Sequence, residues 1–233
     1  MANVALVGLD MHIGSQIARH EPYDEALGRV VSLVRQLRER GARSLRFVDV
    51  GGGLGVTYDA EAPADVGRFA SVVGDHVRGL DVTLVVEPGR FIVANAGLLL
   101  TRVLYRKHSG GKDYVITDAG MNDLVRPSIY KAYHGIEAVA PRGGTVVADV
   151  VGPVCETGDF FAHGRETDDV VSGDLVAIRS AGAYGYVMSS NYNSRPRAAE
   201  VLVDGGRFAV VTERETFDDL VRREADSPTW RTS

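Results

Sequence analysis

The chain has 233 residues, of which 45% are hydrophobic and 24% charged, so it can bury a sizeable core. Its net charge of -5 provides no basic footprint for nucleic acid or for an anionic membrane surface. The single cysteine excludes an internal disulfide framework, and no apolar stretch is long enough for a signal segment or a membrane span. We therefore expect a cytoplasmic globular protein without nucleic-acid or membrane partners.

The first part of the chain predicts alternating strands and helices. In chain order, we expect a strand over 4–9, a helix over 24–40, a strand over 45–50, a helix over 64–80, a strand over 82–87 and a short helix over 91–96. Apolar residues at helical spacing identify the first helix, and Gly41 follows it as a stop. This alternation is typical of parallel βα units.

The second part of the chain predicts an antiparallel β-domain. Its expected strands cover 98–107, 114–118, 145–151, 174–179, 199–203 and 207–213, and they are separated by turns that contain Gly, Pro or Asp. A helix over 216–223 follows, with Thr216 as its N-cap. We predict two domains, a partial α/β barrel over 1–97 and a β-sandwich or barrel over 98–233.

Polar clusters follow the three early strands. They read HIGSQ from His12, GGGLG from Gly51 and EPGR from Glu87. In a parallel barrel the carboxyl ends of the strands meet at one end, which is where active sites lie. Glycine amides can face an anion, and a carboxylate can pair with a protonated ring nitrogen. The clusters predict a site for a flat, phosphorylated cofactor, although each alone also fits a tight turn, a structural histidine or an ion pair.

Three later motifs carry further reactive groups. Cys155 lies in GPVCETGD. A free cysteine is usually buried, but the acidic, glycine-flanked loop around Cys155 favours an accessible thiol that donates protons. The runs RPSIYKAYH from Arg126 and AYGYVMSSNYNSRP from Ala183 combine arginine with tyrosine, which suits carboxylate recognition. Each run also fits a solvated loop or the rim of a dimer interface.

Taken in order, these six motifs resemble the diaminopimelate decarboxylases, a pyridoxal-phosphate-dependent family with an alanine-racemase-like fold. The resemblance extends over about residues 6–215. It implies α/β plus all-β architecture, with the last βα units of a (β/α)8 barrel followed by a C-terminal β-sandwich or barrel. It also implies a homodimer that decarboxylates meso-2,6-diaminopimelate to L-lysine and CO2 in lysine biosynthesis.

The resemblance also implies residue roles. His12 would stack on the ring of pyridoxal 5′-phosphate, Glu87 would pair with its nitrogen, and Cys155 would be the proton donor. The implied cofactor-binding residues are His12, Ser15, Gly51, Gly52, Gly53, Glu87, Pro88, Gly89, Arg90 and Tyr184. The implied substrate-binding residues are Arg90, Arg126, Tyr130, Glu156 and Tyr184. Cys155 and Glu156 would serve the site of the partner subunit, and no metal is expected.

In this family the lysine that binds the cofactor covalently follows an early barrel strand. The lysines of this sequence are Lys107, Lys112 and Lys131, and none follows a strand of the predicted barrel part. We therefore expect an incomplete portion of the enzyme that is inactive by itself. Two alternatives remain open, namely a related decarboxylase of the ornithine, arginine or carboxynorspermidine type, and a non-catalytic dimerisation or regulatory homologue.

Overall fold

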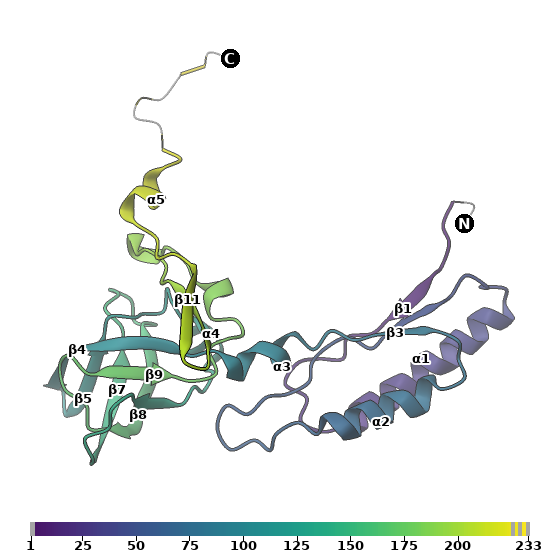
Figure 1. Cartoon of the computed structure of the whole chain (residues 1–233), viewed down its shortest axis with the longest axis horizontal. Helices are drawn as coiled ribbons and strands as arrows, with labels where there is room; N and C mark the ends of the chain where they lie inside the picture. Colours follow the sequence, from purple (N-terminus) through teal and green to yellow (C-terminus); the bar gives the residue numbers. More distant parts are fainter. Residues whose placement is uncertain (1–2, 225–226, 228–229, 232–233) are drawn as a thin grey trace. The chain divides into compact units, whose positions relative to one another are not determined.

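The computed structural model describes residues 3–224, 227 and 230–231. It divides into two compact units, Met1–Gly97 and Leu98–Ser233, which are coloured purple to blue and teal to yellow in Figure 1. In the described residues, no helix has the length and apolar character needed to cross a membrane.

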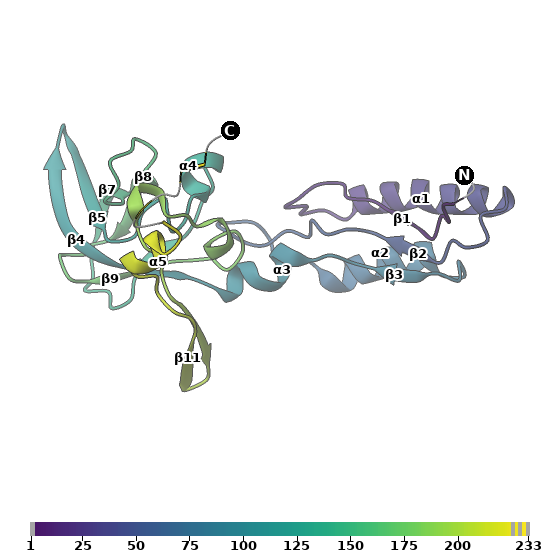
Figure 2. The ribbon, with the colours of Figure 1, turned by 90° about the horizontal axis from the view of Figure 1, so that it is seen from above.

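The first unit contains a parallel sheet of three short strands. They are β1 (Gly8–Asp10), β2 (Phe47–Asp49) and β3 (Thr83–Val85), in that spatial order. The helices α1 (Glu21–Glu39) and α2 (Val66–Val77) connect them and lie side by side (Figure 2). After β3 the chain forms α3 (Gly89–Val93) and a 3-10 turn, η1 (Ala94–Ala96).

The helices form because their sequences carry both end signals and an apolar stripe. Acidic side chains occupy the first turn of α1, and Arg38 lies in its last turn, which complements the helix dipole. The Asp65 carboxylate caps α2 by accepting from the Arg68 amide at 2.8 Å. Leu27 of α1 and Val72 of α2 pack with Val48 of β2 in one buried cluster, which places both helices and the central strand around a common core.

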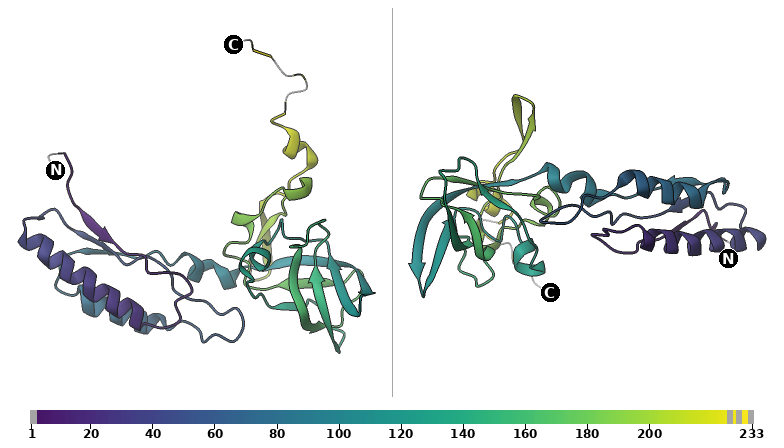
Figure 3. Two further views of the ribbon diagram at one scale, coloured as in Figure 1. Left: turned by 180° about the vertical axis from the view of Figure 1, so that it is seen from behind. Right: turned by 90° about the horizontal axis from the view of Figure 1, so that it is seen from below.

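The second unit is built on a six-stranded sheet. Its strands are β4 (Leu99–Ser109), β5 (Lys112–Thr117), β6 (Ile136–Ala138), β7 (Thr145–Val151), β8 (Phe160–Asp168) and β9 (Leu175–Ile178). Their spatial order is β6-β9-β4-β5-β7-β8, and every pair is antiparallel except β5–β7. The end strands β6 and β8 also contact each other, so the sheet nearly closes into a barrel (Figure 3).

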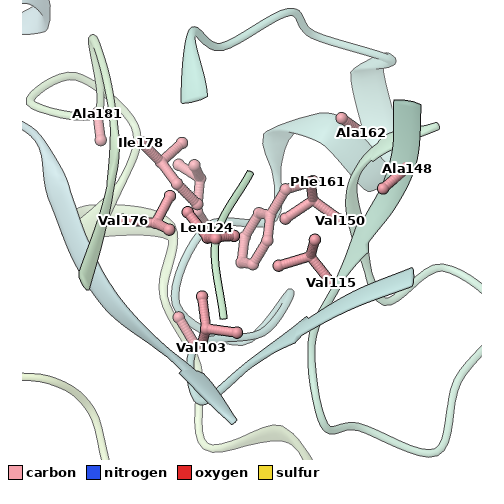
Figure 4. Packing of buried hydrophobic residues seen from close by; sticks show 12 residues of the cluster. Val103, Val115, Leu124, Ala148, Val150, Phe161, Ala162, Val176, Ile178 and Ala181 are labelled. Atoms are coloured by element: carbon pink, nitrogen blue, oxygen red, sulfur yellow. The ribbon is translucent and has the colours of Figure 1, made fainter. Parts of the chain in front are cut away.

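The interior of this barrel is aliphatic around one aromatic ring. Phe161 of β8 packs with Leu124, Val103, Val115 and Val150, all of which are buried (Figure 4). At the edge, the Asp168 carboxylate of β8 accepts from the Ala138 amide of β6 at 2.6 Å. This bond links the two end strands where the ladder itself is not continuous.

Three more elements complete the second unit. The helix α4 (Arg126–Tyr130) precedes β6, and the hairpin of β10 (Glu200–Asp204) and β11 (Arg207–Thr212) turns at Gly205, whose φ is 58°. The chain then enters α5 (Phe217–Val221), where Thr216 and Asp219 form a capping box. Thr216 is thus the N-cap, as predicted.

The predicted architecture of parallel βα units followed by an all-β barrel is confirmed, with local differences. Sheet pairing of the first strand begins at Gly8, so the apolar run from Val4 lies mostly before the strand. The elements α4, β6 and β8 were not predicted. The sequence of β8, FFAHGRETD, is rich in charge and contains Gly164, so it is a strand because of its pairing with β7.

Candidate functional site

The glycine run at the end of β2 interlocks with the loops that follow β1 and β3. A Cβ added at any of Gly51–Gly53 would collide with a backbone carbonyl oxygen of a neighbouring loop, namely that of Met11, Glu87 or Gly14 respectively. The φ angles of the first and last of these glycines are 68° and 95°, a region that favours glycine. These glycines therefore allow three strand ends to approach as closely as their backbones permit.

Hydrogen bonds hold the three loops together. The Glu87 amide donates to the Gly51 carbonyl at 2.9 Å, and the Ile17 amide donates to the Gly53 carbonyl at 2.9 Å. The Gly51 amide itself donates to the Asp49 carboxylate at 2.9 Å. The structure thus brings the three predicted clusters to one place, but the N–H of Gly51 is directed to a protein carboxylate.

A buried tyrosine of α1 contacts the glycine loop that follows β2. Tyr23 of α1 donates from its hydroxyl to the carbonyl oxygen of Gly52 at 3.0 Å. Its ring packs edge-on against Phe69 of α2, with centroids 5.0 Å apart. Burial raises the pKa of Tyr23, so the hydroxyl remains a donor at neutral pH. The sequence placed Tyr23 before the predicted helix and provided no signal for this contact.

Arg90, the second residue of α3, connects the third loop to the other two. Its Nη2 donates to the Ser15 hydroxyl at 3.0 Å, and its Nη1 donates to the Tyr58 hydroxyl at 2.8 Å. The guanidinium carbon lies 5.8 Å from the Tyr58 ring centroid. Tyr58 was not predicted, because it lies in a polar segment without any periodic pattern.

The donors and acceptors gathered here fit a phosphorylated pyridine. A serine hydroxyl, a guanidinium and the amides of Gly52 and Gly53 could bind a phosphate, since each is an N–H or O–H donor. The Glu87 carboxylate is exposed and could accept from a ring N–H, and the exposed His12 imidazole offers a flat face. Pro88 forms the turn into α3, where the Gly89 amide donates to the Glu87 carbonyl at 2.8 Å.

In the second unit, one buried acid organises the cysteine loop. Asp159 is only 5% exposed, and its carboxylate accepts from the amides of Val154 at 2.5 Å and Met121 at 2.6 Å. Burial raises the pKa of this carboxyl, against the effect of the two amides. Cys155 and Glu156 are exposed on the loop that Asp159 holds, so the predicted accessibility of the thiol is confirmed.

The run from Ala183 also meets this loop. The Tyr192 hydroxyl lies 3.4 Å from the Glu156 carboxylate, and Arg195 Nε donates to the Asn122 side-chain oxygen at 2.9 Å. Tyr184, in the same run as Tyr192, is 40% exposed and has a φ of 59°. The run from Ala183 therefore lies beside the cysteine loop through Tyr192, a residue that sequence reasoning did not single out.

The predicted substrate residues of α4 differ in exposure. Arg126 is 7% exposed, and its Nη1 lies 2.9 Å from Nε2 of His134, whereas Tyr130 is 63% exposed. The burial of Arg126 is incompatible with the solvated-loop interpretation of that residue. Among the described residues, no three His, Cys, Asp or Glu side chains gather as a metal site.

The lysines lie outside the first unit. Lys107 is in β4, Lys131 follows α4, and Lys112 of β5 places its Nζ 3.6 Å from the Asp149 carboxylate. None lies at the strand ends that carry His12 and Glu87. The structure thus agrees with the sequence in offering no strand-end lysine in that unit.

Comparisons with known proteins agree with these features. Residues 23–182 match the family model "Pyridoxal-dependent decarboxylase, C-terminal sheet domain". A diaminopimelate decarboxylase of Pseudomonas aeruginosa is 51% identical over 227 residues, which cover 97% of this chain and 54% of that protein. The chain therefore spans about half the length of the curated relatives it matches.

Solved structures give the same result. A crystal structure of AQ1208 from Aquifex aeolicus matches with a TM-score of 0.94 and 46% identity, covering 97% of this chain and 56% of that one. Diaminopimelate decarboxylase from Helicobacter pylori, complexed with L-lysine, matches with a TM-score of 0.87 and 43% identity, covering 93% and 54%. These matches confirm the resemblance drawn from the six motifs. Because the family model covers well over half of its residues, the chain belongs to the pyridoxal-dependent decarboxylases.

Proposed function

We propose that this chain forms part of a cytoplasmic pyridoxal-phosphate-dependent enzyme that decarboxylates meso-2,6-diaminopimelate to L-lysine and CO2 in lysine biosynthesis. The observation that carries the proposal is the Arg90 guanidinium, which joins Ser15 and Tyr58 beside the interlocked glycine loop and Glu87. The relatives from Pseudomonas aeruginosa and Helicobacter pylori support the substrate, because both are named diaminopimelate decarboxylase.

The first unit provides the cofactor cradle in this proposal. His12 stacks on the pyridine ring, and Glu87 accepts from the ring nitrogen and keeps it protonated. Ser15 and Arg90 hold the phosphate together with the amides of Gly52 and Gly53, whereas Gly51 contributes through its carbonyl, which anchors Glu87. Bound pyridoxal phosphate supplies an electron sink for the charge that CO2 leaves behind.

The second unit provides the substrate groups. Arg126 and Tyr130 bind the distal carboxylate of the substrate, and Glu156 binds the distal ammonium, because these pairs match in charge and geometry. The exposed Cys155 donates a proton to the substrate carbon that has lost CO2. Tyr184 contacts both cofactor and substrate. In a homodimer, Cys155 and Glu156 serve the site of the partner subunit.

The test is an activity measurement on a chimera. This chain is joined to the part of the Pseudomonas aeruginosa relative that it does not cover, and CO2 release is measured with meso-diaminopimelate, L-ornithine and L-arginine. We expect release from meso-diaminopimelate alone. Release only from ornithine or arginine would defeat the proposed substrate. A monomeric chimera in sedimentation velocity would defeat the proposed homodimer.

A matched pair of variants tests the proton donor. Replacing Cys155 with Ala in the chimera removes the acid, and we expect kcat to fall by about 100-fold, in the range found for lost general acids. The control variant Ser172→Ala changes a side chain in the loop before β9, whose hydroxyl donates to the Leu104 carbonyl at 2.6 Å. Equal kcat values for the two variants would contradict the assigned role of Cys155.

A further inference from the structure

The imidazole of His134 is completely buried, and both of its nitrogens face a polar group. Nδ1 lies 2.8 Å from the backbone carbonyl oxygen of Arg179, and Nε2 lies 2.9 Å from Nη1 of Arg126. A carbonyl oxygen only accepts hydrogen bonds, so Nδ1 carries the ring proton. Nε2 then has a lone pair, which accepts from the guanidinium.

The charges around the ring favour this neutral form. Burial, together with the nearby guanidiniums of Arg126 and Arg165, lowers the pKa of His134 to about 4, against the opposing effect of the hydrogen bond to the Arg179 carbonyl. Arg165 Nη1 also donates to the backbone carbonyl of His134 at 2.9 Å, while Arg179 is paired through its guanidinium with Glu137 at 3.0 Å. His134 is therefore an acceptor for Arg126 throughout the physiological pH range.

The acceptor fixes more than one bond of Arg126. A guanidinium is planar and its five donors form a rigid fork, so holding Nη1 at a set point fixes the directions of the other donors. Arg126 lies at the first position of α4 and is 7% exposed, so water competes little for the group. An orientation set in this way is maintained before any ligand arrives.

We propose that His134 is a positioning residue, whose unprotonated Nε2 orients the Arg126 guanidinium toward the distal carboxylate of the substrate. This inference rests on the proposed function, because the carboxylate belongs to the proposed substrate. His134 does not contact the substrate itself. Its effect is on the affinity for ligands that carry the distal carboxylate, and it leaves the chemical step unchanged.

Two substitutions separate the two hydrogen bonds of the ring. His134→Asn keeps an amide donor near the position of Nδ1 and loses the acceptor for Arg126. His134→Gln places an amide oxygen near the position of Nε2, which keeps the acceptor, and loses the donor to Arg179. If His134 only anchors the end of β9 through Arg179, the Gln variant should lose more substrate affinity than the Asn variant. If His134 positions Arg126, the Asn variant should lose more.

The readout is the division of the effect between KM and kcat in the chimera described above. For His134→Asn we expect KM for meso-diaminopimelate to rise by at least about tenfold, as for a lost hydrogen bond to a charged group, with kcat nearly unchanged. His134→Gln is expected to stay within about threefold of the parent. In the Asn variant, the inhibition constant of L-lysine should rise together with KM. The inhibition constant of 1,5-diaminopentane, which has no carboxylate, should not change.

The outcomes distinguish this inference from the proposed function. If the parent chimera is active, two results overturn the positioning role: the Asn variant keeps the parent's KM, or the Gln variant has the higher KM of the two. Neither result contradicts the proposed decarboxylase function. A parent inactive on meso-diaminopimelate overturns the proposed function and with it the stated target of Arg126. Nitrogen NMR of the chain itself adds a test without turnover, and a His134 ring that is charged or protonated at Nε2 at pH 7 overturns the inference.

Discussion

The hydroxyl of Tyr23 donates to the carbonyl oxygen of Gly52 at 3.0 Å, and both residues are buried. The phenol comes from the helix layer, and the carbonyl belongs to the loop at the end of β2. A side chain of the first unit's core therefore contacts the backbone of the proposed cofactor cradle. This bond therefore couples the packing of α1 to the shape of the loop.

Replacing Tyr23 with Phe tests that coupling. The ring still fills its place, but the Gly52 carbonyl loses its donor inside the core, which should cost about 1–3 kcal/mol. Urea denaturation of the chain measures the change. Tyr105→Phe is the control, because Tyr105 is exposed on β4, and its change should stay within about 0.5 kcal/mol. Equal losses in the two variants would contradict the importance of the bond.

Gly52→Ala tests the close approach of the loops. The new Cβ would collide with the Glu87 carbonyl, so we expect a destabilisation of about 1–3 kcal/mol, as in other overpacked sites. Gly74→Ala is the matched control, since Gly74 lies within α2 and an added Cβ there meets nothing within 4 Å. That control should gain about 0.5–1 kcal/mol in the same denaturation experiment. A stable Gly52→Ala protein would show that the loops can separate easily.

Arg90→Ala tests the anion end of the cradle. The change removes the donors that hold Ser15 and Tyr58, and we expect the Kd of the chain for pyridoxal 5′-phosphate, measured by absorbance titration, to rise by at least about tenfold. Arg29→Ala removes an exposed arginine of α1 that pairs with Glu25 and should leave the Kd unchanged. Parallel changes in the two variants would indicate a nonspecific charge effect.

Borohydride reduction tests the absence of a covalent anchor. With pyridoxal 5′-phosphate present, we expect peptide mapping to find no specific adduct on Lys107, Lys112 or Lys131, because none lies in the unit that carries the cradle. Free lysine in the same reaction confirms that reduction occurred. A single lysine modified in full would overturn this expectation.

His134 predicts a component of the acid sensitivity of the fold. Its pKa is about 4 in the folded chain and 6.5 ordinarily, so the unfolded chain binds the proton first. The stability that it contributes is complete above pH 6.5 and is lost as the pH falls toward 4, by up to about 3 kcal/mol at 1.36 kcal/mol per unit. His134→Asn should remove this component from the pH profile of unfolding, whereas His108→Asn, at an exposed histidine, should not. Superimposable slopes for His134→Asn and the parent would contradict the prediction.

Parts of the site could be predicted because their signals are local. Each strand-end cluster, such as Glu87 to Arg90, is contained within a few residues that follow an apolar strand. Tyr58 and Tyr23 could not be predicted, because they join the site through contacts with residues 32 and 29 positions away. The burial of Arg126 escaped prediction for a different reason: His134 is only eight residues away, but it comes from an irregular segment after α4 that has no periodic pattern to indicate burial.

The secondary structure follows the same division. The helix α1 carries a periodic apolar face and was predicted to within a few residues at both ends. The strand β8 has no clear alternation, and only its ladder with β7 makes it a strand. The local sequence is sufficient to predict the helix α1, whereas in β8 tertiary pairing overrides the local propensity.

The interlocked glycine loop has a consequence for how this chain can vary. The carbonyl oxygens of Met11, Gly14 and Glu87 occupy the space of the three absent side chains, so no one of the three loops can change its backbone independently. Recombination with a homologous gene would preserve the strand-end geometry only where the segment from Met11 to Gly89 is inherited as one block. Crossovers within that block would combine loops that were never fitted to each other.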